Sequence, residues 1–294
     1  MRILFQNYSN SLSSEPLYMH NALRQCGIES HLWSDPNVSA FDALDTVKPD
    51  VLVCHYRNIT NDVVTYLKTN KLDLAINATG ATETQLKSIA EVFKETGTNV
   101  PFIFSNSAVD IMPKVGLRTE QILPAADIFN IQPKSGRPHE IEAVVSNDFS
   151  ENVKNMIGEM GVYHLLYVTD GELNPTFDLR VTAMSLTRLF NVYKKISLVG
   201  GKDLCLSQMF FDMVLAGVNM QIKCSDQPSF NKFLSTVFKE SDTDNIPSEM
   251  KNQIKTRHTP FHRAGRLLKF LKHTDGVNNI EKAKAQLPEL LKDI

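Results

Sequence analysis

The stretch LSQMFFDMVLAGVNM, residues 206–220, contains a single carboxylate, Asp212, in an apolar run. The pattern predicts a buried helix followed by a buried strand, where a charge costs free energy unless a partner binds it. Ser207 can cap the helix, and Gln208 lies four residues before Asp212, so both side chains should share one face. The helix follows a loop, GGKDLC, that leaves the strand KISLVG. Helix amino termini in such places bind phosphate through free backbone N–H groups.

This placement suggests a nucleotide site. One turn into the helix, the Asp212 carboxylate can accept hydrogen bonds from both hydroxyls of a ribose, as the acidic residue of dinucleotide-binding folds does. The alternative is that Asp212 only complements the helix dipole or is a solvated gap in the apolar stripe. Position and residue type alone do not separate these interpretations.

The elements that must position these residues alternate along the chain. In the first part, the predicted strands are RILFQNY, ESHLW, DVLVCHY, LDLAINATG and VPFIFSN, with helices at 16–26, 41–47 and 61–68. The clearest helix is TETQLKSIAEVFKETG, in which Thr82 and Gln85 can form a capping box and Gly97 ends the helix. Apolar strands separated by helices indicate a parallel sheet covered on both faces.

Between residues 124 and 138 the sequence is rich in Pro and Gly and has no period, which indicates a connection between domains. Strands then recur at EIEAVVS, YHLLYVT, KISLVG and NMQIKC, with helices at 151–160, around 178–190, after 207 and around 227–238. A chain of 294 residues is too long for one ordinary core. We expect an α/β fold of two doubly wound, Rossmann-like domains, 1–125 and 126–256, facing across a cleft, with a C-terminal helical segment at 257–294.

The bulk composition is that of a globular protein, with 42% hydrophobic and 22% charged residues and a net charge of −2. Cys26, Cys54, Cys205 and Cys224 form no CxxC pair, which indicates a reducing compartment and no structural metal. The first residues enter a strand instead of a signal peptide, and no apolar run approaches the roughly 20 residues of a membrane span. We therefore expect a cytoplasmic protein with no membrane partner.

Three stretches resemble the CgeB-like family of GT-B glycosyltransferases. They are ILPAADIF (122–129), SQMFFDMVLAG (207–217) and RHTPFHRAGRLLKFL (257–271), and their order and spacing extend over most of residues 1–275. The resemblance implies two Rossmann-like domains, a nucleotide-sugar donor, most often a UDP-sugar, as co-substrate, and no tightly bound cofactor. It also implies that a carboxylate binds the nucleotide ribose, and Asp212 stands where the family usually has Glu.

The implied reaction moves a sugar from the nucleotide to an acceptor hydroxyl, and the departing diphosphate gathers negative charge that N–H groups or cations must bind. The candidates for contacts to the donor lie after strand ends: Ser146, Asn147, Asp170, Gly200, Gly201, Lys202 and Ser207, together with Gln208 and Asp212. Asp170 also opens the turn where a base would lie. A Gly-Gly pair by itself is usually only a turn.

An inverting transferase also needs a general base, normally from the first domain. His55 ends the strand DVLVCHY and is the candidate, with Asp110 and His20 as competitors. A histidine at a strand end is more often an ordinary loop residue. A retaining enzyme would need no such base, and the sequence leaves the stereochemistry open.

The segment 251–273 has seven basic side chains and no Asp or Glu: Lys251, Lys255, Arg257, Arg263, Arg266, Lys269 and Lys272. It is either a solvated helix that docks through Leu267, Leu268 and Leu271, or a surface that attracts a polyanion.

The second interpretation resembles the compact bacteriophage transferases that glycosylate 5-hydroxymethylcytosine in double-stranded DNA, inside the host cytoplasm. Arg257, His258, Arg263 and Arg266 would then contact the DNA. The alternatives are a polysaccharide, protein or small-molecule acceptor and, from another class, a non-catalytic nucleotide-binding protein or a GT-B-type epimerase.

Overall fold

The computed structural model describes residues 1–6, 15–35, 37–70, 72–78, 81–96, 102–105, 119–129, 131, 142–146, 151, 155, 159, 164–167, 179–180, 195–200, 208–238 and 248–294. The chain divides into two compact units. The first contains Met1–Tyr8, Pro16–Leu123 and Arg263–Lys282, and the second contains Ser9–Glu15, Pro124–His262 and Ala283–Ile294.

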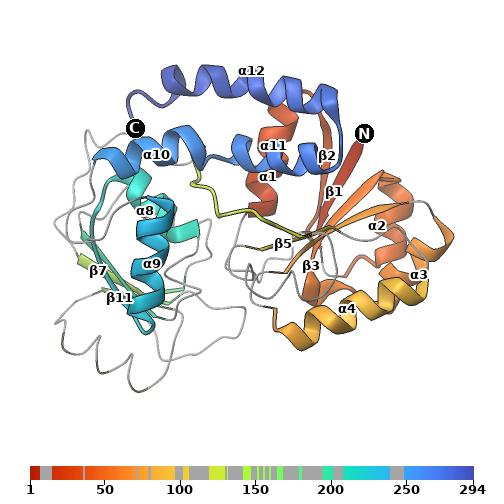
Figure 1. Cartoon of the computed structure of the whole chain (residues 1–294), viewed down its shortest axis with the longest axis horizontal. Helices are drawn as coiled ribbons and strands as arrows, with labels where there is room; N and C mark the ends of the chain where they lie inside the picture. Colours follow the sequence, from red (N-terminus) through yellow and green to blue (C-terminus); the bar gives the residue numbers. More distant parts are fainter. Residues whose placement is uncertain are drawn as a thin grey trace. The chain divides into compact units, whose positions relative to one another are not determined.

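The first unit is built on a parallel sheet of six strands in the order β2-β1-β3-β4-β5-β6 (Figure 1). Its strands are β1 (Arg2–Gln6), β2 (Glu29–Trp33), β3 (Val51–His55), β4 (Asp73–Asn77), β5 (Phe102–Ser105) and β6 (Thr119–Gln121). Its helices are α1 (Glu15–Gln25), α2 (Ala40–Val47), α3 (Asn61–Thr69) and α4 (Glu83–Thr96). The predicted parallel sheet is confirmed, and β6 is an addition to it. This strand is short and polar, so no apolar run marks it in the sequence.

Local signals in the sequence set the ends of several helices in this unit. The chain leaves α1 through Gly27, whose φ of +72° suits a residue without a Cβ atom. The predicted capping box of α4 is present. The backbone N–H of Gln85 donates to Thr82 Oγ1 over 3.3 Å, and Gln85 Oε1 accepts from the backbone N–H of Thr82 over 2.9 Å.

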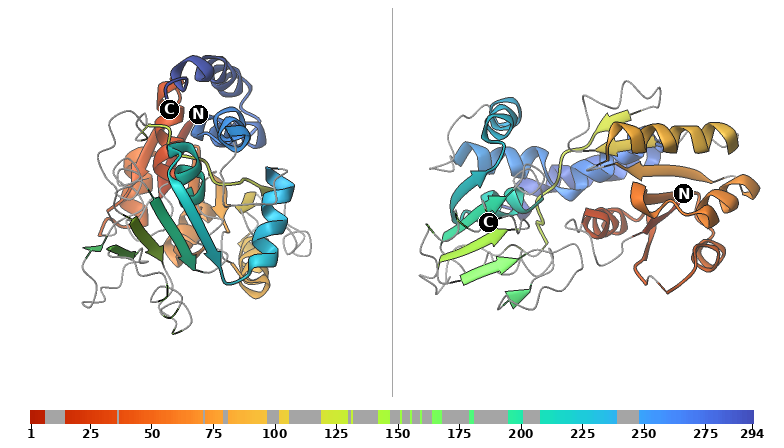
Figure 2. Two further views of the ribbon diagram at one scale, coloured as in Figure 1. Left: turned by 90° about the vertical axis from the view of Figure 1, so that its left-hand side faces the viewer. Right: turned by 90° about the horizontal axis from the view of Figure 1, so that it is seen from below.

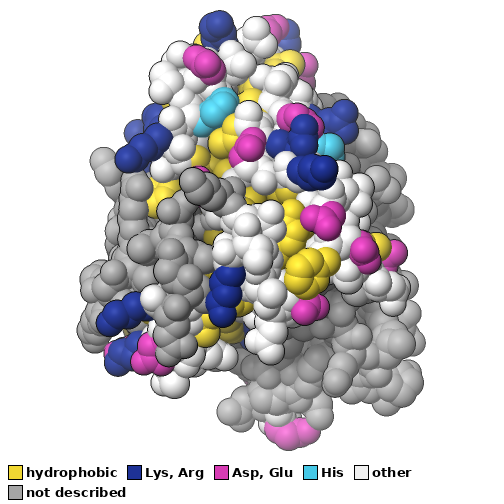
Figure 3. Space-filling view, turned by 90° about the vertical axis from the view of Figure 1, so that its right-hand side faces the viewer, with side chains coloured by type: hydrophobic (Ala, Val, Ile, Leu, Met, Phe, Trp, Pro, Cys, Tyr) yellow, Lys and Arg dark blue, Asp and Glu magenta, His cyan; other side chains and the backbone are white. Residues whose placement is uncertain are grey.

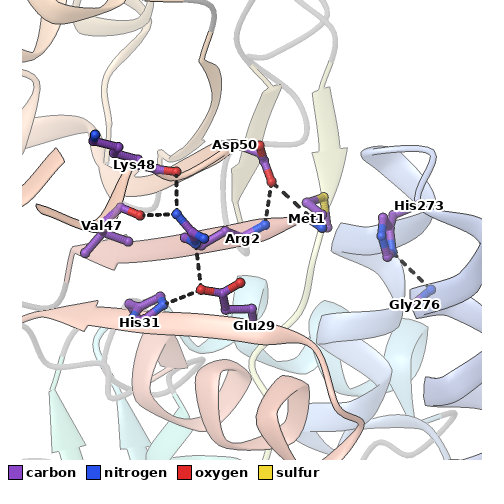
Figure 4. A network of polar contacts seen from close by, with 9 residues as sticks. All are labelled: Met1, Arg2, Glu29, His31, Val47, Lys48, Asp50, His273 and Gly276. Atoms are coloured by element: carbon purple, nitrogen blue, oxygen red, sulfur yellow. Dashed lines mark hydrogen bonds and ion pairs between the residues drawn. The ribbon is translucent and has the colours of Figure 1, made fainter. Parts of the chain in front are cut away.

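At the amino edge of the first sheet, Arg2 joins three elements (Figure 4). Its Nε donates to Glu29 Oε1 over 2.6 Å, and its Nη1 donates to the carbonyl oxygens of Val47, over 2.6 Å, and Lys48, over 3.2 Å. A cation at the carboxyl end of α2 complements the helix dipole. Hydrogen bonds from His31 and Arg2 lower the pKa of the Glu29 carboxyl. This network fixes the sheet at the edge opposite the carboxyl ends of the strands.

The second unit contains a parallel sheet of five strands in the order β11-β10-β7-β8-β9, whose green and teal arrows lie side by side in Figure 2. Its strands are β7 (Glu142–Ser146), β8 (His164–Tyr167), β9 (Leu179–Arg180), β10 (Lys195–Gly200) and β11 (Asn219–Cys224). The helices of this half whose full extent the structure describes are α8 (Gln208–Ala216), α9 (Gln227–Val237) and α10 (Ser248–Arg257). The last two helices, α11 (Pro260–Phe270) and α12 (Thr274–Leu290), each belong partly to both units.

The predicted helix around 178–190 is corrected at its start. Leu179 and Arg180 form strand β9 and pair with Leu166 and Tyr167 of β8. Pairing at a sheet edge depends on a partner distant in sequence, so local pattern does not reveal it. Residues 181–190 lie outside the described residues. In the predicted helix at 151–160, the described residues 151, 155 and 159 are helical.

The core of the second unit forms around α8, all nine of whose residues are buried. Phe210 packs edge-to-face against Phe230, with ring centroids 5.7 Å apart, and against Phe238 at 5.8 Å. These contacts hold α8 against α9 and the residue that follows it. The two polar residues of α8, Gln208 and Asp212, are therefore enclosed by protein. None of the described helices is long and apolar enough to span a membrane.

Candidate functional site

Each sheet has one point at which the strand order reverses. In the first sheet β1 lies between β2 and β3, and in the second β7 lies between β8 and β10. Ligands of open parallel sheets bind outside the carboxyl ends of the strands at such a switch point. The strand ends at these points are Gln6 and His55 in the first unit and Ser146 and Gly200 in the second.

Two of the residues predicted to contact a nucleotide lie together at the second switch point. Leu198 of β10 pairs with Val145 of β7, so Ser146 and Gly200 end neighbouring strands within about one residue of the same level. Both residues are buried. The backbone N–H of Ser225 donates to the carbonyl oxygen of Gly200 over 2.9 Å, which fixes the end of β10. The other candidates after strand ends, Asn147, Asp170, Gly201, Lys202 and Ser207, lie outside the described residues.

Gln208 and Asp212 share one face of α8, as their spacing predicts. Gln208 Nε2 donates to Asp212 Oδ2 over 3.2 Å. Both side chains are buried, with relative exposures of 3% and 1%. Asp212 Oδ1 accepts a second hydrogen bond, over 2.5 Å, from the backbone N–H of Asp127. Asp212 is therefore neither exposed nor a solvated gap, because protein donors replace water at both carboxylate oxygens.

Asp127 was not predicted as a site residue, although it lies in the ILPAADIF stretch. Its side chain is fully buried, and its Oδ1 accepts from the backbone N–H of Phe129 over 3.0 Å. The neighbouring backbone N–H of Ala126 donates to the carbonyl oxygen of His258 over 2.8 Å. Residues 124–129 are thus held by α8 through Asp212 and by the residue that follows α10. This gives Asp212 a structural role, and its contact with a ribose stays a prediction.

His55 is the last residue of β3, level with Asn77 of β4, and is half-buried. Its Nδ1 accepts from the backbone N–H of Arg57 over 3.4 Å and so caps the short 3₁₀ helix Tyr56–Asn58. Its ring lies 4.6 Å from that of Tyr56. Since Nδ1 is the acceptor, the neutral ring has its proton on Nε2. To take a proton from a substrate, His55 must therefore exchange tautomers or give up this weak cap.

His20, a competitor for the role of base, lies on α1 away from the strand ends. It is buried, and its Nδ1 is 3.0 Å from Ser30 Oγ on β2. Burial lowers its pKa, and the charges of Arg24 and His31 lower it further. This histidine is a neutral core residue that joins helix to sheet. Asp110 lies outside the described residues.

The basic segment 251–273 is not a uniform surface. Arg263 and His258 are buried, with 2% and 6% of their surface exposed, whereas Arg257 and Arg266 are exposed. The His258 ring packs 5.2 Å from Phe211. Helical spacing could have placed Arg263 correctly, because Leu267, four residues later on the same face, is fully buried. Buried side chains do not reach a duplex unless the structure around them changes.

Two of the lysines in this segment already have partners. Lys255 Nζ donates to the carbonyl oxygen of Leu291 over 2.6 Å, and burial lowers its pKa. Lys269 Nζ lies 3.4 Å from Glu281 Oε1. On the face in Figure 3, basic and acidic side chains are interspersed. The absence of acidic residues from 251–273 therefore does not make an unopposed positive surface.

No protein-family model matches the sequence, and a search of curated proteins found no match. Among solved structures, sucrose-phosphate synthase from Thermosynechococcus elongatus is similar over 93% of this chain and 99% of its own, with 9% identity and a TM-score of 0.57. The glycosyltransferase SnogD from Streptomyces nogalater matches over 92% of this chain and 99% of its own, with 15% identity and a TM-score of 0.49. The first similarity shows that this chain shares its α/β fold, with parallel sheets, with sucrose-phosphate synthase.

Proposed function

We propose that this protein is a glycosyltransferase, which moves a sugar from a nucleotide-sugar donor to an acceptor hydroxyl. The fold similarity to sucrose-phosphate synthase supports the proposal. The observation that carries it is the meeting of Ser146 and Gly200 on neighbouring strand ends at the switch point of the second sheet, because this is where open α/β folds bind nucleotides.

The donor is proposed to be a UDP-sugar, bound by the second unit. Gly200 and Ser146 would lie beside the diphosphate, with Asn147, Gly201, Lys202 and Ser207 completing its contacts and Asp170 nearby. N–H groups and a lysine are suited to the charge that gathers on the departing diphosphate. The Gln208–Asp212 pair, on the helix that follows, is proposed to bind the ribose.

The first unit is proposed to bind the acceptor across a cleft, with His55 as the general base. In an inverting reaction the acceptor oxygen attacks the anomeric carbon, and the bond from that carbon to the diphosphate oxygen breaks. The bonding electrons leave with the diphosphate, and His55 takes the hydroxyl proton. The position of His55 at the switch point of the first sheet supports this role.

The acceptor is proposed to be 5-hydroxymethylcytosine in bacteriophage DNA, within the cytoplasm of the host. The exposed side chains of Arg257 and Arg266 support it, whereas the partners of Lys255 and Lys269 reduce the charge available for DNA. The target base would have to leave the stack to enter an active site, at a cost of a few kcal/mol. A polysaccharide, protein or small-molecule acceptor is the alternative.

A thermal-shift screen tests the donor directly, because a ligand that binds only the folded state raises the melting temperature. We expect UDP-sugars and UDP to raise it in a saturable way, and unrelated sugar phosphates to leave it unchanged. If no nucleotide or nucleotide sugar shifts the transition, the proposed function is wrong. The acceptor is tested by offering modified and unmodified duplexes with each donor and weighing the nucleosides afterwards. Labelling of the modified duplex alone supports DNA, and labelling of neither favours another acceptor.

A further inference from the structure

One arginine at the carboxyl edge of the first sheet has an exposed guanidinium that its neighbour holds in place. Arg57 follows His55, the last residue of β3, by two positions, and its Nε donates to Tyr56 Oη over 3.0 Å. Its Cζ lies 5.5 Å from the centroid of the Tyr56 ring. Tyr56 is 7% exposed and belongs to the core of this unit. A buried ring is thus a fixed support for a long side chain that would otherwise be mobile.

The other donors of this guanidinium have no partner among the described residues. Since Nε is engaged, the N–H groups of Nη1 and Nη2 are left, and they form a planar fork. Arg57 forms no ion pair with a carboxylate of the described part of the chain. By contrast, Arg2 places Nε on Glu29 and Nη1 on two carbonyl oxygens. A fixed fork whose charge is not neutralised suits the bidentate binding of a phosphate or a carboxylate.

Arg57 belongs to the same short segment as the proposed general base. Its backbone N–H donates to His55 Nδ1 over 3.4 Å, which ties the two residues together. Asn77 ends β4 level with His55, and both residues are half-buried. This edge of the sheet therefore has accessible polar groups and a positive charge, at the place where the proposed function binds the acceptor.

We propose that Arg57 binds an oxyanion of the acceptor, a phosphate or a carboxylate, while His55 takes the proton from the acceptor hydroxyl. The inference rests on the proposed function and adds the chemical class of the acceptor, which is an anion. A nucleotide of DNA, a phosphorylated sugar and a sugar acid share this chemistry. A charge-assisted bidentate contact would fix the orientation of the acceptor as well as strengthen its binding.

Chemical protection tests the oxyanion site with the wild-type protein and inorganic phosphate as the probe. Phenylglyoxal reacts with accessible guanidinium groups, and an anion bound to such a group slows the reaction. At constant ionic strength, phosphate should slow the modification of Arg57 in a saturable way, as measured by peptide mass spectrometry. Arg24 is the internal control, because it is exposed on the last turn of α1, close to the first residue of β2 and so at the opposite edge of the sheet. Equal slowing at both arginines, or slowing at neither, would overturn the proposal.

Matched acceptors identify the source of the oxyanion. The pairs are 5-hydroxymethyldeoxycytidine with and without its 5′-phosphate, a hexose with and without a phosphate, and a hexuronic acid with its hexose. In at least one pair, kcat/KM should be on the order of tenfold higher for the member with the oxyanion. Arg57→Met should remove this preference, and Arg24→Met should retain it. A preference in the first pair supports a nucleotide, and one in the others supports a sugar. Equal kcat/KM within every pair contradicts the inference.

The outcomes separate the inference from the proposed function. If the protein transfers sugar but phosphate protects Arg57 no better than Arg24, the inference fails and the proposed function stands. If no nucleotide binds and no acceptor is labelled, the proposed function fails, and the assignment of the oxyanion to an acceptor fails with it. If Arg57→Met does not fold, the protection experiment and the acceptor pairs still decide the question with the wild type.

Discussion

Replacing Asp212 with Asn or with Ala should separate the two roles given to this carboxylate. Its two oxygens accept from the backbone N–H of Asp127 over 2.5 Å and from Gln208 Nε2 over 3.2 Å, and it is 1% exposed. In Asp212→Asn, the new amide oxygen can still accept from Asp127. The new NH₂ group then meets the Gln208 amide, which can rotate by 180° and accept from it.

The magnitudes follow from this geometry. Asp212→Asn exchanges a charge-assisted hydrogen bond for a neutral one, so the free energy of unfolding should fall by only about 1 kcal/mol. Asp212→Ala leaves two buried donors without an acceptor, each costing about 1–3 kcal/mol, so the loss should be about 2–6 kcal/mol. The Gln208–Asp212 pair is also proposed to bind the ribose, so Asp212→Asn should weaken donor binding by roughly 1–3 kcal/mol.

Urea unfolding followed by circular dichroism measures the free energies of unfolding of the two variants, and calorimetry with UDP measures the donor affinity of Asp212→Asn. The structural reasoning is refuted if Asp212→Ala is no less stable than Asp212→Asn. The functional reasoning is refuted separately if Asp212→Asn binds UDP with unchanged affinity. In that case Asp212 only anchors residues 124–129.

Three further predictions concern other parts of the chain. His55→Ala should lower turnover on the order of a hundredfold with donor binding intact, and His55→Asn, which can still accept from the backbone N–H of Arg57, should be equally slow. Recovery of turnover in His55→Asn would show that His55 only caps the turn. Near-normal turnover of both variants would favour another base or a retaining mechanism. Burial lowers the pKa of His20 below its ordinary value of 6.5, so its contribution to stability is complete above that pH and is lost as the pH falls from 6.5 toward the folded-state pKa. The urea midpoint of His20→Gln should therefore fall less on acidification than that of the wild type. Parallel pH profiles of the two proteins would contradict this. If the basic segment guides DNA, Arg266→Ala should reduce the salt dependence of duplex binding by about one phosphate contact. DNA binding that is indifferent to salt would remove DNA from the account.

Much of the fold could be predicted from the sequence because its signals are local. The capping box at Thr82 and Gln85 and the positive φ of Gly27 mark helix ends within a few residues. By contrast, β6 and β9 are edge strands of three and two residues. Their existence depends on a partner strand far away in the sequence, which no local period shows.

The candidate site likewise combines contacts between residues close in the sequence, which could be predicted, with contacts between distant residues, which could not. The pairing of Gln208 with Asp212 follows from helical geometry and was predictable. The hydrogen bond from Asp127 joins residues 85 positions apart, and no local pattern states which backbone N–H a buried carboxylate will receive. The charge run at 251–273 was compatible with a docked, solvated helix and with a surface for a polyanion, because charge alone does not state which face of a helix is buried. Arg263 therefore lies inside while Arg266, three residues later, is exposed.

The central claim is that the second unit binds a nucleotide sugar at the carboxyl edge of its sheet and releases the nucleotide when the sugar is transferred. Release of nucleoside diphosphate from a panel of nucleotide sugars, with hydroxymethylated duplex, polysaccharide and small-molecule acceptors in parallel, tests it most directly. We expect one donor to release its diphosphate with at least one acceptor, at a rate that Gln208→Met and Asp212→Asn lower and Gln221→Met, at an exposed position of β11, does not change. Absence of release with every combination, or release that is equal in all three variants and the wild type, would contradict the account.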